Sequence, residues 1–266
     1  MSFIQLISLA IVQGLTEFLP VSSSGHLILL SKAAHLEDQG ISIDIALHIG
    51  SLLAVLFYFR KTIFLMLKEL FDAKFLLSKS LKYNKLAYLL FVGSLPALLV
   101  GFCLRHIGMD ALREPKIIGF NILIYGILLY LSDKFSPSKR GMDNMTFKDA
   151  LFIGLAQCFA LIPGTSRSGI TITLARMLQI NRVDAAKFSM LLAMPVIFAA
   201  GCLEGYRLFL NGDGGQILLS LDAVFYSFIF SYAVIFLMMK WLKNYTYLPF
   251  VVYRVALGLL LILPIF

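Results

Sequence analysis

The sequence predicts an all-α polytopic membrane protein with about six transmembrane helices and two re-entrant helix hairpins that are related as an inverted repeat. The prediction depends on the composition, on long charge-free runs and on a repeated polar motif. Hydrophobic residues make up 59% of the 266 positions and charged residues only 14%, whereas a soluble domain has about 25% charged residues. One water-soluble core could not bury so much apolar surface, so the bilayer must be the solvent. We expect one integral membrane domain over residues 1–266.

Charge-free runs mark the predicted spans. Leu86–Leu104 approaches the roughly 20 residues that a helix needs to cross the hydrocarbon layer. The other charge-free runs are Ile45–Phe59, Ile117–Ser132, Phe188–Leu203 and Ala223–Met239. A final span, Tyr245–Phe266, contains one charged residue, Arg254. The N-terminus has neither a basic region nor a small-residue cleavage site, so we expect no cleavable signal peptide.

Lysines and arginines between the spans predict the orientation of the chain. The segment Arg60–Lys85 is rich in them, and the positive-inside rule places such a segment in the cytoplasm. Alternation then puts Arg105–Lys116 outside, Asp133–Lys148 inside and Arg207–Gln216 outside. The net charge of +8 follows from this distribution, so we expect no nucleic-acid partner.

A polar motif occurs twice in the chain. The segment Gln13–Gly25 resembles Gln157–Gly169, and its first glutamine and last glycine both recur 144 positions later. In each copy a proline ends one helix, and a cluster of serines and threonines is suited to cap the next. Each copy therefore predicts a helix–turn–helix hairpin that enters the membrane partway and returns.

The spans that follow the two copies are predicted to run in opposite directions. Ile45–Phe59 ends at the cytoplasmic basic segment, whereas Phe188–Leu203 begins on that side and ends outside. Two related halves of opposite orientation, near residues 3–60 and 147–206, form an inverted repeat, which is common in transporters. Non-helical backbone within a membrane is tolerated only inside protein or beside a water-filled cavity. We therefore expect the two hairpins to face each other.

The second hairpin has the features of a phosphate-binding site. Helix N-termini bind anions through their exposed N–H groups and the helix dipole, and two hairpins that face each other bring two N-termini together. Arg167 adds a planar set of donors suited to phosphate oxygens. The hydroxyl groups nearby belong to Ser166, Ser168 and Thr171.

The first hairpin carries residues suited to acid–base chemistry. Gln13 and Glu17 are four residues apart and therefore lie on one helix face. A carboxylate in an apolar span costs about 2.5–3.5 kcal/mol on insertion scales, so Glu17 needs a partner or a function. Ser23 and His26 are three residues apart. We expect them on one face, as nucleophile and base, or with the histidine as a base that activates water.

Purely structural roles remain open for the same residues. Glu17 could form an ion pair with Arg167 that simply locks the two hairpins together. The serines could act only as helix caps, and we expect this of at least one of them. These serines are Ser22, Ser23 and Ser24.

The histidines and one arginine have less specific surroundings. His26 could be a buried histidine whose hydrogen bonds are satisfied. Three other histidines have no comparable neighbours in the sequence, so we expect no role in the site for them. They are His35, His48 and His106. Arg254 could neutralise a carboxylate or a bound phosphate, and the sequence leaves both open.

At these residues the chain resembles the undecaprenyl-diphosphate phosphatase family of the bacitracin-resistance type. The family pattern of Glu or Gln, three residues, then Glu is matched by Gln13 and Glu17, and the match continues to His26. The second signature, Pro-Gly-x-Ser-Arg-Ser-x-x-Thr, is matched in full by Pro163–Thr171. The similarity extends along nearly the whole chain. One departure is Gln13, because some relatives carry a second glutamate there.

The resemblance implies an enzyme and its location. The reaction is hydrolysis of undecaprenyl diphosphate, a polyprenyl diphosphate lipid, to undecaprenyl phosphate and inorganic phosphate. It recycles the lipid carrier of cell-wall (peptidoglycan) synthesis, which affects cell shape and bacitracin resistance. The protein is expected in the bacterial inner (plasma) membrane, as a multi-pass protein among membrane lipids, with its active site open to the extracytoplasmic face. A homodimer is left open.

The resemblance also assigns residues. The predicted catalytic residues are Glu17, Ser23, His26 and Arg167, and a divalent cation, Mg²⁺ or Ca²⁺, is required. Because of Gln13, the motif offers only the Glu17 carboxylate to this metal. Either waters and substrate phosphates complete the shell of the ion, as is common for Mg²⁺, or Glu17 acts without direct coordination. The residues expected to bind substrate are Gln13, Ser22, Ser24, Gly164, Thr165, Ser166, Ser168 and Thr171.

Two other functions can be separated from this one. A transporter or lipid flippase would share the inverted repeat and the broken helices, but it needs no nucleophile, so phosphate release distinguishes it from a phosphatase. The type-2 phosphatidic acid phosphatases act on the same class of substrate, but their signature needs Ser-Arg, five residues, then His. Counting from Ser166 and Arg167 reaches Thr173, so this signature is absent.

Overall fold

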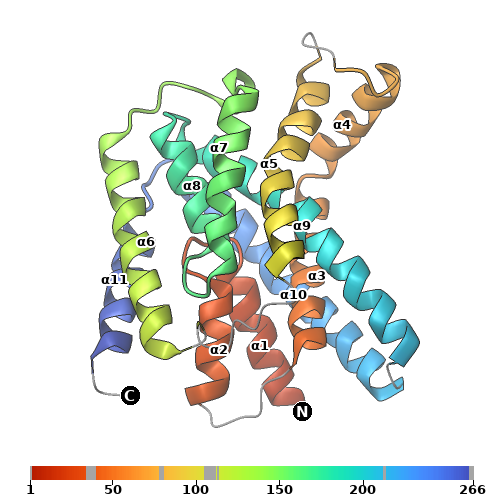
Figure 1. Cartoon of the computed structure of the whole chain (residues 1–266), viewed down its shortest axis with the longest axis vertical. Coiled ribbons are helices and arrows are strands. Elements are labelled where there is room, and N and C mark those ends of the chain that lie inside the picture. The colour runs from red at the N-terminus through yellow and green to blue at the C-terminus, as the bar shows by residue number, and fades with distance from the viewer. Residues whose placement is uncertain are drawn as a thin grey trace.

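The computed structural model is all-helical in the part of the chain that it describes, without a β-strand (Figure 1). The described residues are 2–33, 40–77, 81–104, 112, 114–211 and 214–263. His35 and His106 lie outside them. Large apolar side chains on outward faces, such as Phe91, Phe120 and Phe225, are at least 50% exposed. Lipid favours such a surface and water does not.

Four helices within the described ranges are long and apolar enough to cross a bilayer, or five if a bent pair counts as one span. The four are α5 (Lys82–Leu104), α6 (Pro115–Phe135), α9 (Arg182–Asn211) and α10 (Gly214–Trp241). The bent pair consists of α3 (Ile41–Tyr58) and α4 (Arg60–Asp72), with an angle of 77°. The last helix, α11 (Leu248–Ile262), is apolar but shorter. The prediction of an all-helical, polytopic membrane protein is confirmed.

Two helix pairs form hairpins at the repeated motifs. The first pair is α1 (Phe3–Thr16) and α2 (Ser23–Ala33), and the second is α7 (Phe147–Gln157) and α8 (Arg167–Met177). In Figure 1 the first pair lies in the lower half of the molecule and the second in the upper half, and their turns approach each other near mid-height. The turns touch, because the Ser168 hydroxyl donates to the Leu19 carbonyl oxygen at 2.9 Å.

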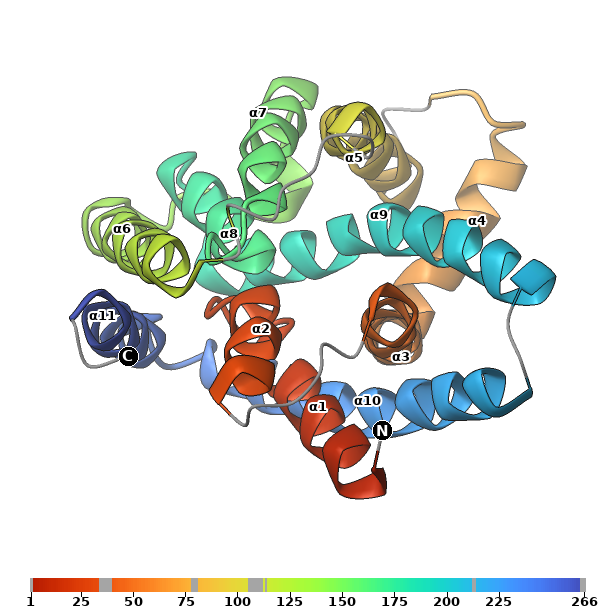
Figure 2. The same ribbon diagram turned by 60° about the horizontal axis from the view of Figure 1, so that its bottom comes forward.

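Glycines let the long helices pack closely around the hairpins. Seen in Figure 2, α3 lies between α9 and α10. At Gly50 of α3 an added Cβ would lie 2.3 Å from the Val224 carbonyl oxygen of α10, and at Gly154 of α7 it would lie 2.2 Å from the Gly93 carbonyl oxygen of α5. Small residues at such crossings are a common packing device of membrane helices, and here they leave no room for a larger side chain.

A buried ion cluster fixes the outer end of the second hairpin. Asp133 at the end of α6 accepts hydrogen bonds from Arg176 of α8 (3.0 Å) and Arg182 of α9 (2.7 Å). It also accepts one from the backbone N–H of Tyr247, just before α11, at 3.3 Å. The cluster thus joins four helices at the end of the molecule where α4 and the α6–α7 connection also lie (Figure 1). This is the end that carries the two segments predicted to be cytoplasmic.

Candidate active site

Arg254 of α11 holds the turns of both hairpins. Its side chain is fully buried, and its guanidinium donates to the carbonyl oxygens of Pro20 (3.0 Å) in the first turn and of Gly164 (3.2 Å) and Thr165 (3.0 Å) in the second. Its Nε donates to the carbonyl oxygen of Ile122 in α6 at 3.0 Å. The sequence left open a carboxylate or a phosphate as its partner. In the described part of the chain its hydrogen-bond acceptors are backbone carbonyls, and it positions the two turns side by side.

The two turns have matching conformations. Ser22 and Ser166, which lie 144 positions apart, both have positive backbone φ angles of 78° and 71°. Each side chain accepts a hydrogen bond from the backbone N–H three residues later, at Gly25 (3.4 Å) and at Gly169 (3.1 Å). Left-handed backbone at a residue other than glycine costs free energy and is concentrated at functional sites. Both serines therefore act as helix caps, as we expected for at least one residue of the first cluster.

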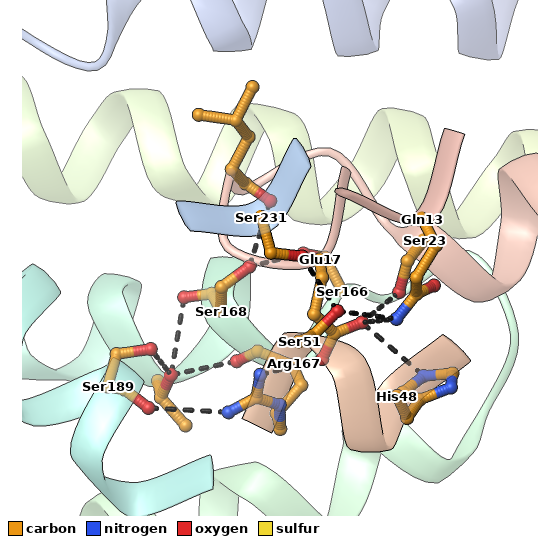
Figure 3. A network of polar contacts seen from close by, with 12 residues as sticks. Gln13, Glu17, Ser23, His48, Ser51, Ser166, Arg167, Ser168, Ser189 and Ser231 are labelled. Atoms are coloured by element: carbon orange, nitrogen blue, oxygen red, sulfur yellow. Dashed lines mark hydrogen bonds and ion pairs between the residues drawn. The ribbon is translucent and has the colours of Figure 1, made fainter. Parts of the chain in front are cut away.

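Glu17 is the centre of the polar network between the hairpins (Figure 3). Its Oε1 accepts a hydrogen bond from Nη2 of Arg167 at 2.8 Å. Its Oε2 accepts from the Ser23 hydroxyl at 2.6 Å and from the amide Nε2 of Gln13 at 3.0 Å. The residue is only 5% exposed. Two predicted catalytic residues and one predicted binding residue thus meet at one buried carboxylate.

The expected pair of Ser23 and His26 does not form. The His26 ring bonds the Ser22 carbonyl oxygen through Nδ1 (2.7 Å) and the Tyr253 hydroxyl through Nε2 (2.6 Å), and it stacks on the Tyr253 ring. Ser23 is the first residue of α2, and its hydroxyl turns back toward Glu17, whereas His26 faces α11. The pairing expectation was wrong because the turn, rather than the helix face, sets the direction of the Ser23 side chain.

His48 of α3 is the imidazole that lies beside Glu17, which corrects our expectation that it had no comparable neighbours. Its Nε2 is 3.4 Å from Oε2 of Glu17, and its Nδ1 is 2.7 Å from the carbonyl oxygen of Asp44. A carbonyl oxygen only accepts, so Nδ1 must carry a proton. Nε2 is then the ring nitrogen that faces the carboxylate. A signal was present, because Asp44, His48 and Ser51 follow one another at spacings of four and three residues and therefore lie on one helix face.

A chain of buried hydroxyl groups lies beside the Gln13 amide, next to α10. Its Nε2 also lies 3.4 Å from Oγ of Ser51, which in turn bonds Ser231 (2.9 Å) and Ser227 (3.2 Å) of α10. All four side chains are fully buried. The network fixes the Gln13 amide so that it donates to Glu17, and these serines were not predicted from the sequence.

Arg167 is held in a similar way from the other side. Its Nη1 donates to the carbonyl oxygen of Ser189 at 3.3 Å. The Thr171 hydroxyl bonds the Arg167 carbonyl oxygen (2.8 Å) and the Ser189 hydroxyl (2.7 Å). The Ser168 hydroxyl bonds Leu19, as described above. Thr171 and Ser168 therefore hold the helices together.

A cavity of about 260 Å³ opens beside this network. Its polar lining consists of Glu17, Ser22, Ser23, Ser24, His48, Gln157, Ser166 and Arg167. The apolar walls come from α3, α5 and α9 and from the 3-10 turn after α7, and include Ala97, Leu161 and Val196. The cavity therefore has a polar end with charged and hydroxyl groups, and its remaining walls are apolar. Five predicted binding residues are not part of its lining, namely Gln13, Gly164, Thr165, Ser168 and Thr171.

The side chains around Glu17 offer few oxygen ligands to a hard cation. Within the described residues no group of three or more His, Cys, Asp or Glu side chains could hold a metal, so an ion here would rely on few protein ligands. The oxygen atoms in the cavity lining there are those of the Glu17 carboxylate and the Ser23 hydroxyl. The amide Oε1 of Gln13 is buried without a partner, but Gln13 is not part of the lining. Mg²⁺ and Ca²⁺ prefer such ligands, and Mg²⁺ usually keeps waters and substrate phosphates in its shell.

A comparison with protein-family models identifies the family. The model described as "Bacitracin resistance protein BacA" matches residues 6–260, which include both hairpins and the cavity between them. The chain belongs to this family.

Relatives within the BacA family are similar over their whole length. Proteins of Alteromonas mediterranea, Nitrosococcus oceani and Hahella chejuensis are 40%, 44% and 42% identical to this chain. The aligned regions cover 100%, 98% and 97% of this chain and 100%, 98% and 96% of the relatives. All three are named undecaprenyl-diphosphatase. The match therefore covers both the helical framework and the site residues.

Proposed function

We propose that this BacA-family protein is an undecaprenyl-diphosphatase, which hydrolyses undecaprenyl diphosphate to undecaprenyl phosphate and inorganic phosphate. One observation carries the proposal. The hydroxyl of Ser23, the carboxylate of Glu17 and the guanidinium of Arg167 are directly connected at the polar end of a cavity whose other walls are apolar. A lipid with an anionic head group fits such a cavity. The reaction recycles the lipid carrier of cell-wall synthesis.

In the proposed reaction Ser23 is the nucleophile. Its O–H already donates to Oε2 of Glu17 at 2.6 Å, so the carboxylate is placed to take the proton as the oxygen attacks the terminal phosphorus. The bond from this phosphorus to the bridging oxygen breaks, and undecaprenyl phosphate leaves. Water then hydrolyses the phosphoserine and releases inorganic phosphate. Direct attack by water, with Glu17 or His48 as the base, is the alternative.

Other residues would stabilise the negative charge that develops on the phosphate oxygens during this reaction. Arg167 uses one N–H for Glu17 and one for Ser189, so the remaining donors of its guanidinium can bind phosphate oxygens. The hydroxyls of Ser24 and Ser166 line the same cavity. A Mg²⁺ or Ca²⁺ ion, held by Glu17 with waters and phosphates, would supply neutralising charge to the diphosphate. His26, which was also predicted to be catalytic, is not among the residues that line the cavity, and its Nε2 bonds the Tyr253 hydroxyl.

We also propose a topology of six spans and two re-entrant hairpins, in one integral membrane domain with an inverted repeat. The bent α3–α4 pair and α11 would be spans beside α5, α6, α9 and α10. Three features support the repeat: the hairpins enter from opposite ends (Figure 1), Ser22 and Ser166 have matching turns, and α1 packs on α10 as α7 packs on α5.

The cavity is proposed to open to the extracytoplasmic face of the bacterial inner membrane. Its residues Ile45, Ala97 and Ala200 lie in the parts of α3, α5 and α9 that are remote from the basic end of the molecule. The positive-inside rule assigns that basic end to the cytoplasm. Substrate would enter from the surrounding lipid, and the homodimer stays a prediction.

The direct test is release of inorganic phosphate from undecaprenyl diphosphate by the detergent-purified protein, with and without EDTA. We expect release that requires Mg²⁺ or Ca²⁺. Folded wild-type protein that releases no phosphate with either ion would contradict the proposal. Lipid flux in liposomes would then test a flippase, the function that opposed hairpins would otherwise suggest.

A further inference from the structure

Gln157 and Gln13 occupy equivalent positions in the two hairpins, 144 residues apart. The amide of Gln13 has partners, because its Nε2 donates to Glu17 at 3.0 Å and lies 3.4 Å from Ser51. The same offset leads from Glu17 to Leu161 and from Ser51 to position 195, a proline. Neither of these side chains has a polar atom. The second half of the repeat therefore offers neither partner to its glutamine.

The amide of Gln157 is consequently buried without a hydrogen bond. The residue is 2% exposed, and neither its Nε2 nor its Oε1 has a partner in the described part of the chain. Buried polar groups in native proteins are almost always paired, so a buried amide with both ends free needs an explanation. Gln157 lines the cavity that contains Glu17 and Arg167. A ligand that enters this cavity is therefore the candidate for the missing partner.

The position of Gln157 indicates which part of a ligand it meets. It lies at the end of α7, directly before the 3-10 turn Cys158–Leu161. Ala160 and Leu161 of that turn form an apolar wall of the same cavity together with Val196. Gln157 thus stands where the polar lining passes into the apolar wall. In a lipid diphosphate that crosses this boundary, the group at the transition is the phosphate that carries the lipid.

We propose that Gln157 binds the lipid-side phosphate of the substrate, with Nε2 donating to one of its non-bridging oxygens. The inference rests on the proposed function. In that reaction the bond between the terminal phosphorus and the bridging oxygen breaks, and its electron pair stays on the bridging oxygen of the lipid phosphate. A donor to this phosphate stabilises the leaving group and also retains the lipid product. Inorganic phosphate, which binds at the terminal position beside Arg167, does not contact Gln157.

The test compares two ligands and two matched variants. The dissociation constants of undecaprenyl phosphate and of inorganic phosphate are measured by thermophoresis on full-length wild-type protein, Gln157→Leu and Gln5→Leu. The second variant makes the same chemical change in α1, away from the cavity. We expect Gln157→Leu to raise the dissociation constant of undecaprenyl phosphate by about tenfold or more, because a hydrogen bond to a charged group is lost. Inorganic phosphate should bind as tightly as to the wild type, and Gln5→Leu should change neither constant.

Thermal melting separates ligand binding from a structural role. Gln157→Leu removes an unpaired buried amide, so its melting temperature without ligand should equal or exceed that of the wild type. A lower melting temperature, unchanged binding of undecaprenyl phosphate, or equal weakening of both ligands would overturn the inference. Gln157→Glu provides a second variant of similar shape. Its negative charge should weaken the binding of undecaprenyl phosphate more than Gln157→Leu does. Binding is read without turnover, so a wild-type protein that binds the lipid but releases no phosphate contradicts only the proposed function.

Discussion

The carboxylate of Glu17 and the guanidinium of Arg167 lie 2.8 Å apart, although 150 residues separate them in the chain. The pair joins the first hairpin to the second inside the cavity. Two interpretations of these residues, a lock between the hairpins and a catalytic pair, therefore apply to the same contact. Both partners are largely buried, with side chains 4% and 14% exposed. Experiments on either residue must accordingly measure stability and activity together.

Glu17→Gln should reduce phosphate release by at least about a hundredfold, because the base for Ser23 is lost. Arg167→Ala should do the same and should also lower the free energy of unfolding by about 3–5 kcal/mol, since it leaves a buried carboxylate unpaired. Initial rates and melting curves of the purified variants check both. Arg140→Ala is the matched control, because it breaks an ion pair with Asp149 away from the cavity. If Arg167→Ala lost no more activity than this control, the pair would be only a lock.

Ser23→Ala should abolish turnover while preserving the ion pair between Glu17 and Arg167. The reason is that its hydroxyl is the group that donates to Oε2 of Glu17 in the cavity. Acid quenching of the wild type during turnover should yield a phosphopeptide that contains Ser23. Ser24→Ala, which changes the neighbouring hydroxyl of the cavity lining, should raise KM more than it lowers kcat. Wild-type rates in Ser23→Ala would favour direct attack by water.

Local patterns predicted the parts of the site that depend on neighbouring residues. The prolines and serines of each motif predicted the hairpins, and the buried charges of Glu17 and Arg167 predicted that they need partners. Ser168 and Thr171 were predicted to bind substrate, and their hydroxyls make contacts within the protein. Thr171 bonds the carbonyl oxygen four residues earlier, which is a known habit of threonine in helices. Ser168 instead reaches the other hairpin, and only the assembled fold reveals that contact.

The site features that the sequence did not predict depend on contacts between helices that are distant in the chain. His48 became a neighbour of Glu17 because α3 packs beside the first hairpin, and its spacing to Asp44 and Ser51 could not show which residue it would face. The lack of partners for Gln157 could not be inferred either, because it depends on which side chains fill the space around it. Arg254 was noted as a buried charge, but its carbonyl partners belong to two separate turns and to α6.

His48→Gln should lower kcat by about tenfold or more, whereas His26→Gln should have a smaller effect. The reason is geometric, because Nε2 of His48 faces Glu17 at 3.4 Å, while both ring nitrogens of His26 are bonded to Ser22 and Tyr253. The measurement is the steady-state rate of each variant with undecaprenyl diphosphate, at one pH and one metal concentration. It shows which of the two substitutions lowers kcat more. A larger loss in His26→Gln would restore the pairing first expected from the sequence.

Arg254→Leu should destabilise the protein by about 3 kcal/mol or more, because it removes the donor for carbonyl oxygens in both turns and leaves them buried. Activity should fall with it, since Pro20 and Gly164 set the distance between the hairpins that bring Glu17 to Arg167. Arg254→Lys keeps the charge but cannot reach both turns, so it should restore stability only in part. Melting temperature and phosphate release, measured on the same samples, should decline together across the wild type, lysine and leucine. A stable but inactive Arg254→Leu would instead mean that this guanidinium acts on the substrate rather than on the turns.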